Sequence, residues 1–405
     1  MQDMAHEKFI PSATIDEFAE RIAKWYESNH LDFKAMFHAT IEGLKKPPVD
    51  KSSDVYYDWE KHGTIDGLCN FFREWYAWEP KVEEGLNYIE KFSWLNYRND
   101  DGMKFVTTGA GLLMTYDFTQ LQGRYMDSPA SRDLVGKWEE ELGPKMEDYV
   151  VPQDGFQNFN EFFTRDLKPG VRPIDAPNDD SVVVAPADCV INMIVDDLTA
   201  DTALPVKTVT MNVETLLDRS EYAASFVKDH KRGDTSGGTA VSCILMPDTY
   251  HWYHSPVTGR VVESRDDIGG IYYGMRDFPE LLNKGDVGYG YDYSMFEHFR
   301  RGYLVIETEQ HGYVGMVPVG LNSIASVRFL EKFRDVNDTT GSVAVNKGEK
   351  IGYFKYGGSL NILLFEPGRF PALRLLQGQR IGQLEMTLPG FFSTSGRAPS
   401  ANLES

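Results

Sequence analysis

The chain has 405 residues, 41% hydrophobic and 13% aromatic, which is enough for a sizeable core and for two or three domains. Its net charge of −20 would be repelled by nucleic acid and by anionic lipid surfaces, so we expect no nucleic-acid partner. Three cysteines far apart in the sequence, no signal-peptide pattern and no apolar run near 20 residues predict a cytoplasmic protein without a disulfide framework or a transmembrane segment.

The first 150 residues have the pattern of amphipathic helices. Thr14 followed by Glu17 resembles a capping box, which satisfies free backbone N–H groups at the start of a helix. Apolar residues then recur at steps of three and four, which is more typical of a packed core than of a cofactor contact. We therefore expect a helical accessory domain over residues 1–150. Its clearest predicted helices are Ile15–Tyr26, Ile65–Tyr76 and Ala130–Leu142.

Beyond about residue 150 the sequence changes to short β-branched runs separated by Gly, Pro, Asp and Asn, the pattern of strands. Because little helix separates these runs, antiparallel pairing is favoured over a doubly wound parallel sheet. The expected fold is therefore α+β, with a β-rich, mostly antiparallel domain over residues 151–392 and a disordered tail over 393–405. The expected strands are 181–184, 190–195, 206–211, 240–246, 303–308, 313–319, 324–330 and 360–365.

The most informative stretch runs from Gly341 to Phe365 and holds Gly357-Gly358-Ser359. Two glycines before a serine allow a sharp bend and leave the Gly358 carbonyl without a shielding Cβ. If the Ser359 hydroxyl adds to that carbonyl, the peptide becomes an ester, β-elimination opens the ester to dehydroalanine, and hydrolysis gives ammonia and a pyruvoyl group. The same tripeptide also suits a tight hairpin turn, so self-cleavage requires a base within reach.

Two histidines and an aspartate are candidates to assist this serine. His251 and His254 follow an apolar strand; they would converge in a turn or helix and point to opposite faces in an extended segment. One could act on Ser359 and the other on a substrate, whereas a metal pair lacks a third ligand of matching spacing. Asp188 ends a hydrophobic strand, where a carboxylate could hold an imidazole in the required tautomer. The alternatives are a structural histidine and a turn aspartate.

Taken together, these segments resemble the phosphatidylserine decarboxylase family over roughly residues 156–366. The resemblance implies that Asp188, His254 and Ser359 form the self-processing triad and that His251 assists decarboxylation or reprotonation. It also implies a cut between Gly358 and Ser359, after which residues 359–405 stay associated with the larger chain. The segments that carry the resemblance, in order, are FNEFFTR at 159–165, LKPG at 167–170, RP at 172–173, APAD at 185–188, YHWYH at 250–254 and GYFKYGGS at 352–359.

The cofactor implied by the resemblance is a covalent pyruvoyl group derived from Ser359, with no metal. A ketone of this kind condenses with a primary amine to give a Schiff base, which accepts the electrons left behind when carbon dioxide departs. His251, with the near-neutral pKa of an ordinary histidine, would return a proton to the α-carbon. The resemblance therefore implies a carboxy-lyase.

The substrate is less constrained than the reaction. The cut has Gly-Gly-Ser-Leu at 357–360 where many members have Leu-Gly-Ser-Thr, and Cys189 stands where glycine is common. The helical N-terminal region resembles that of soluble members that decarboxylate free aromatic amino acids such as tryptophan, so we expect a free aromatic L-amino acid. Tyr272 and Tyr273 are candidates to line its pocket, or else pack a loop. The alternative is phosphatidylserine, in phospholipid biosynthesis, whose enzyme needs a membrane-binding face.

Two other classes of protein remain open. A non-enzymatic lipoyl-like binding module is suggested by the strand–turn–strand pattern over Val345–Gly352, but its carrier lysine must lie at a hairpin tip, and the two histidines would have no role. An ordinary serine hydrolase would use Ser359 as a nucleophile and leave the chain intact, but the Gly-x-Ser-x-Gly elbow is missing.

Overall fold

The computed structural model describes residues 9–44, 56–82, 87–96, 100–200, 213–229, 231, 233–268, 300–321, 327–373 and 376–379. Tyr272 and Tyr273, the expected strand over 206–211 and the expected tail over 393–405 lie outside these residues. Within the described part, a helical region is followed by antiparallel sheets, which confirms the α+β class.

Threonine caps fix the starts of two of the predicted helices. The Thr14 hydroxyl accepts the Glu17 N–H at the start of α1 (Ile15–Ser28), and Thr64 caps α4 (Ile65–Ala77) in the same way. The third predicted helix, over 130–142, forms as a short helix η3 (Pro129–Ser131) followed by α8 (Arg132–Leu142). The other described helices of this region are η2 (His30–Asp32), α2 (Phe33–Gly43), α3 (Trp59–His62), α5 (Asn87–Asn96), α6 (Asp100–Thr107), α7 (Gly109–Met126), η4 (Gly143–Asp148) and α9 (Phe159–Phe163).

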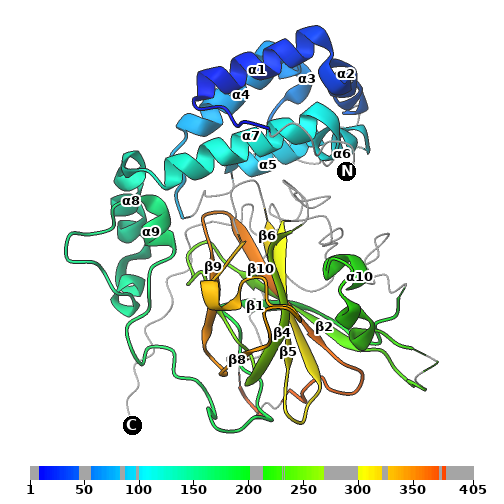
Figure 1. Ribbon diagram of the computed structural model, residues 1–405. Coiled ribbons are helices and arrows are strands. Elements are labelled where there is room, and N and C mark those ends of the chain that lie inside the picture. The colour runs from blue at the N-terminus through cyan, green and yellow to red at the C-terminus, as the bar shows by residue number, and fades with distance from the viewer. Residues whose placement is uncertain are drawn as a thin grey trace.

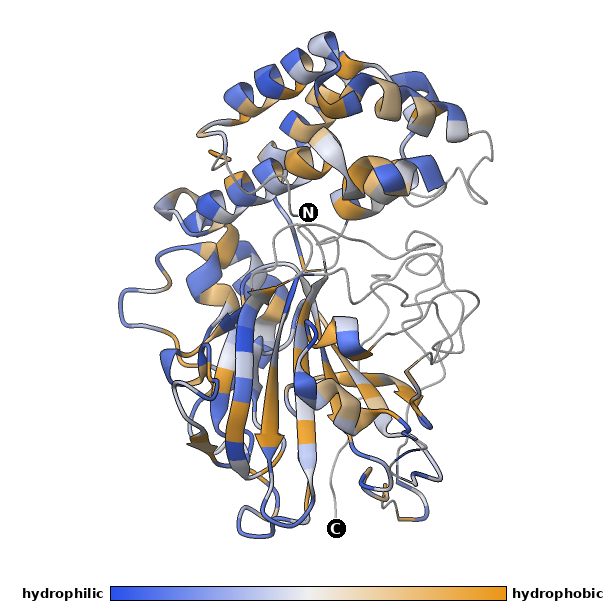
Figure 2. Ribbon diagram, turned by 45° about the vertical axis from the view of Figure 1, so that its right-hand side comes forward, coloured by the Kyte–Doolittle hydropathy of each residue, from blue (hydrophilic) through white to orange (hydrophobic). Residues whose placement is uncertain are grey.

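The helices pack through aromatic side chains. Phe18 of α1, Phe72 of α4 and Phe118 of α7 are buried together, and the Phe72 ring centroid lies 5.1 Å from that of Phe18 and 4.6 Å from that of Phe118. Figure 2 shows apolar and polar bands on the same helices, as amphipathic helices require. None of the helices in the described ranges is long and apolar enough to cross a bilayer. Figure 1 places α1 to α7 at one end of the molecule, above the sheets. Helices α8 and α9 lie lower, to the left of the sheets in this view.

Two antiparallel sheets form the rest of the described chain. The larger has the strand order β1-β2-β10-β6-β5-β4-β8, and the smaller has the order β3-β9-β7. The strands are β1 (Val190–Val195), β2 (Thr239–Leu245), β3 (Trp252–His254), β4 (Gly259–Ile268), β5 (Arg301–Glu307), β6 (Tyr313–Leu321), β7 (Val327–Phe329), β8 (Val343–Val345), β9 (Lys350–Phe354) and β10 (Gly358–Phe365); the short helices are α10 (Val213–Leu216), η5 (Glu221–Phe226) and η7 (Glu331–Phe333).

One strand prediction was wrong, and some of the observed strands were not predicted. No strand forms over 181–184, where the Val184 N–H makes a backbone hydrogen bond to Pro256 but no neighbouring strand pairs with the run. The charged sequence of β4 was not predicted as a strand at all. Its Glu263 accepts a hydrogen bond from the Tyr303 hydroxyl of the neighbouring strand β5. This contact stabilises a charged residue in a strand, where charged residues are uncommon.

The two faces of β10 lie in different environments. Ile362 and Leu364 pack in the apolar cluster that includes α10 and η5, whereas Leu363 and Phe365 pack between the two sheets with residues of β3, β7 and β9. Because side chains alternate along a strand, Ser359 shares the face of Leu363 and points toward the smaller sheet. The residue at the expected cut is therefore enclosed between the sheets.

Candidate active site at the passage between the sheets

The Gly357-Gly358 pair lies where the chain passes from one sheet to the other. Strand β9 ends at Phe354 in the smaller sheet, and β10 begins at Gly358 in the larger one, so the pair is not a hairpin turn. Gly357 has φ 140°, in the range that favours glycine over residues with a Cβ. The bend predicted from the two glycines is therefore present, and it connects layers rather than neighbouring strands.

Ser359 is fully buried, with 0% of its surface exposed. It is paired with Leu245 of β2 and Gly320 of β6, and its Oγ has no hydrogen-bond partner within the described ranges. Buried hydroxyls are usually hydrogen-bonded, so an unpartnered Oγ at this place is unusual. In the uncut chain this enclosed serine cannot meet an external ester or peptide, and a serine hydrolase would have to act with its chain uncut, which argues against that alternative.

The segment just before the bend is fixed by the helical region. The Tyr356 N–H donates to Asn160 Oδ1 at 3.0 Å, and the Lys355 ammonium donates to Asp127 at 2.7 Å. The Tyr356 ring makes an edge contact with Trp138 of α8, at a centroid distance of 6.1 Å. These contacts hold one side of the expected cut while β10 holds the other.

His254 is oriented by a backbone carbonyl. Its Nδ1 lies 2.7 Å from the Gly348 oxygen and must donate to it, so the neutral ring accepts at Nε2 from the Tyr250 hydroxyl, 3.1 Å away. Burial lowers the pKa of His254, while the bond to Gly348 and the charge of Asp188 oppose that shift. Burial therefore favours a neutral His254 ring, and the two hydrogen bonds assign Nδ1 as donor and Nε2 as acceptor.

Asp188 does not hold this histidine. Both of its carboxylate oxygens accept from the Arg172 guanidinium, at 3.1 and 3.0 Å, and Arg172 also donates to Asp148. The His254 N–H nevertheless donates to Pro186 at 2.7 Å, which places the Asp188 segment beside the histidine. The structure thus brings two members of the expected triad into adjoining segments, but no hydrogen bond joins either of them to Ser359 in the uncut chain.

His251 lies in a separate, apolar environment. It is 1% exposed, and its ring stacks on Phe163 at a centroid distance of 3.8 Å. Burial, assisted by the positive charge of Arg165, lowers the pKa of His251 to about 3. The near-neutral pKa expected for this residue is therefore wrong for the uncut chain, because burial disfavours the charged ring and His251 stays neutral at neutral pH. The two histidines diverge, as an extended segment requires.

Lys347 argues against a lipoyl-like carrier. It is 6% exposed, and its ammonium donates to the carbonyls of Ala176, Asp179 and Val182, at 2.6, 2.7 and 3.2 Å. A lysine enclosed in this way stabilises the 176–182 loop and cannot carry a swinging group.

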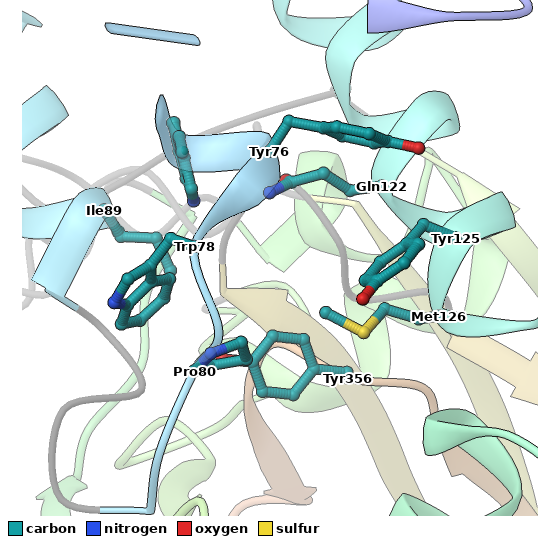
Figure 3. A pocket seen from close by; sticks show the side chains of 9 residues that line it. Tyr76, Trp78, Pro80, Ile89, Gln122, Tyr125, Met126 and Tyr356 are labelled. Carbon is teal, nitrogen blue, oxygen red and sulfur yellow. The ribbon is translucent and has the colours of Figure 1, made fainter. Parts of the chain in front are cut away.

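A small pocket lies between the helical region and Tyr356. Figure 3 shows Trp78, Pro80, Gln122 and Tyr125 around it, with the Tyr356 ring at one side. The pocket has room for about one water molecule, and Gln122 Oε1, which lacks a hydrogen-bond partner in the described structure, is a suitable partner for it. In this form the pocket is too small for an amino-acid side chain.

Several residues of the site were missed from the sequence. Tyr250 and Gly348 orient His254, and Asn160 holds the backbone before the cut. Arg172, the partner of Asp188, belongs to the segment that carried the resemblance, but no role was predicted for it. The two cysteine side chains of Cys189 and Cys243, far apart in sequence, contact each other, with both thiols free.

The fold and the site together define an α+β protein with a buried serine at a glycine bend between two sheets and a histidine–aspartate pair in adjoining segments. Comparison with known families is consistent with this class: the phosphatidylserine decarboxylase model matches residues 159–385, more than half of the chain. The chain belongs to the phosphatidylserine decarboxylase family, whose members are carboxy-lyases made as proenzymes and carrying a serine-derived pyruvoyl group.

The proteins similar to this chain are named phosphatidylserine decarboxylase proenzymes. The chain is 29% identical over 272 residues to phosphatidylserine decarboxylase proenzyme 2 of Oryza sativa subsp. japonica, covering 67% of this chain but 39% of the relative. It is 28% identical over 290 residues to the proenzyme of Clostridium perfringens (strain SM101 / Type A), covering 72% of this chain and 86% of the relative. It is 32% identical over 249 residues to proenzyme 3 of Schizosaccharomyces pombe, of which it spans 23%.

Proposed function

We propose that the chain cuts itself between Gly358 and Ser359 and then decarboxylates an amine-bearing substrate with a pyruvoyl group at position 359. The observation that carries the proposal is the buried Ser359 Oγ, which has no partner in the described part of the chain and directly follows a glycine bend with φ 140°. These features fit a group made from serine within the chain. When formed, the pyruvoyl group supplies a carbonyl that reacts with an amine and accepts electrons as carbon dioxide leaves.

The proposed cut balances as follows. Ser359 Oγ bonds to the Gly358 carbonyl carbon and the peptide C–N bond breaks, which gives an ester. Loss of the Ser359 Cα proton then breaks the Cβ–O bond and releases the Gly358 carboxylate, and water replaces the nitrogen of the resulting dehydroalanine as ammonia. We assign the proton acceptor role to His254, neutral and oriented by Gly348, and an electrostatic role to Asp188.

For the substrate, the named relatives support phosphatidylserine rather than the free aromatic amino acid predicted from the sequence. We therefore propose the serine headgroup of that lipid as the first substrate to test. A free aromatic amino acid stays as a second candidate because the net charge of −20 opposes approach to an anionic lipid surface. Tyr272 and Tyr273 remain proposals for its pocket.

A denaturing gel and a mass measurement test the cut. The purified chain should separate into a large fragment and residues 359–405, with the small fragment blocked to N-terminal sequencing. Ser359→Ala should stay at 45.9 kDa, without carbon dioxide release from phosphatidylserine or from L-tryptophan.

Ser242→Ala is the matched control for this test. Ser242 is also fully buried, and its Oγ has no partner among the described residues, but it is paired with Ile362 and lies on the opposite face of the larger sheet. It should mature as the wild type does. Active wild-type protein that runs as one intact band would contradict the proposal.

A further inference from the structure

Asn361 is a second buried polar side chain on the face of β10 that holds Ser359. It is 0% exposed, and neither its amide oxygen nor its amide nitrogen has a hydrogen-bond partner in the part of the chain that the structure describes. A buried amide without any partner is rare in folded proteins and destabilising. Asn361 therefore lowers the stability of the protein, and its place in the fold alone does not explain why an amide is found there.

The position of Asn361 follows from the strand geometry. Ser359 and Asn361 are two residues apart on one strand, so both side chains point toward the smaller sheet, about 7 Å apart along the strand. The residues directly opposite Asn361 are Cys243 of β2 and Pro318 of β6, and those opposite Ser359 are Leu245 and Gly320. None of these four residues has an amide or a charged side chain, so Asn361 is a polar neighbour of position 359 on this face.

We propose that Asn361 is a substrate-positioning residue that receives the amino-carboxylate group of the substrate. The inference rests on the proposed function. A primary amide offers both a donor and an acceptor, which are the complements of a carboxylate and of an amine N–H. The substrate nitrogen reacts at the carbonyl carbon of position 359. The substrate carboxylate is then only a few bonds from that carbon, close enough to reach the Asn361 amide two residues along the strand.

The neutral amide also suits the reaction better than a cation would. Arg or Lys would form a strong ion pair with the carboxylate and stabilise the substrate before carbon dioxide leaves. Asn361 can orient the carboxylate by hydrogen bonding without that extra stabilisation. The shared chemistry is an α-amino carboxylate, which both phosphatidylserine and a free amino acid carry.

Asn361→Leu tests the proposal, because leucine has a similar shape and no polar atoms. Two pairs of probes differ only in the carboxylate: phosphatidylserine and phosphatidylethanolamine in neutral mixed micelles, and L-tryptophan and tryptamine. For the pair that the wild type accepts, KM for the carboxylated probe should rise about tenfold to a hundredfold. The inhibition constant of the decarboxylated partner should change less than about threefold.

Stability provides a readout that is independent of turnover. Removal of an unpartnered amide from the core should raise the melting temperature by about 2–4 °C. Asn361→Val, which strands favour, provides a second variant if leucine does not fit. Ser242→Ala removes an unpartnered polar atom from the opposite face and should leave the ratio of KM to the inhibition constant unchanged.

The outcomes separate this inference from the proposed function. Failure of the wild-type chain to cut at Gly358–Ser359 overturns the proposed function. Normal cutting together with an Asn361→Leu variant that keeps the wild-type ratio of KM to inhibition constant overturns the role of Asn361 alone. Normal cutting, a raised ratio and a raised melting temperature support both.

Discussion

At the scale of single residues, burial decides what each candidate group can do. His251 and His254 are three positions apart, yet one stacks on an apolar ring and the other is held between a carbonyl and a phenol. The identity of the residues and their resemblance to a family could be read from the sequence. The protonation of His251 could not, because it depends on burial against Phe163 and on the charge of Arg165, which lie about 90 positions away.

His251 should make the stability of the uncut chain depend on pH. Its pKa is about 3 in the fold against 6.5 as the ordinary value, so below pH 6.5 the unfolded chain takes up a proton that the fold excludes. The stability that this exclusion represents is complete above pH 6.5 and is lost as the pH falls toward 3. As the pH falls from 6 to 5, the free energy of unfolding should decrease in both uncut variants. The decrease should be about 1.4 kcal/mol per pH unit smaller in Ser359→Ala/His251→Gln than in Ser359→Ala.

Urea unfolding of these uncut chains at each pH measures the difference. His38→Gln in the same Ser359→Ala background is the control, since His38 is exposed on α2. If the free energy of unfolding changes with pH equally in Ser359→Ala/His251→Gln and in Ser359→Ala, His251 is not a buried neutral residue.

At the scale of elements, local patterns predicted the helical region, three of its helices and several described strands, but not the sheet assignments. Capping threonines and β-branched runs are local, so α1, α4 and β1 appear where they were expected. The run over 181–184 has strand composition and no strand partner, whereas β4 is charged and gains partners on both sides. The passage of β9 and β10 into different sheets depends on long-range pairing, which no local pattern encodes.

Gly357 should therefore matter for cutting as well as for stability. An alanine at φ 140° is strained, so Gly357→Ala should cost about 1–3 kcal/mol and shift the carbonyl that Ser359 must reach. We expect self-cleavage, followed by gel after synthesis in a cell-free system, to slow at least about tenfold.

Gly341→Ala is the matched control for that change. Gly341 also has a positive φ of 79°, with no atom within 4 Å of the added Cβ, but it lies in the turn before β8. It should lose stability and cut at the normal rate. Equal slowing in both variants would attribute the effect to general destabilisation and remove the special role of the bend.

At the scale of the whole molecule, two observations about the substrate oppose each other. The family and the names of the relatives favour an anionic lipid, whereas the chain carries 61 acidic against 41 basic residues. Repulsion between a protein of net charge −20 and an anionic vesicle acts over the Debye length, about 30 Å at 0.01 M salt and about 10 Å at 0.1 M. Salt should therefore distinguish the two substrates.

With vesicles of phosphatidylserine in phosphatidylcholine, the initial rate of carbon dioxide release should rise several-fold between about 0.01 and 0.1 M salt, because screening lets the enzyme approach the surface. The rise should be smaller when the same lipid is diluted into neutral detergent micelles, which lowers the surface charge. With free L-tryptophan the rate should change little, since a zwitterion feels little net force. A rate on vesicles that falls with salt would contradict the repulsion and indicate a local cationic face that attracts the lipid despite the overall charge.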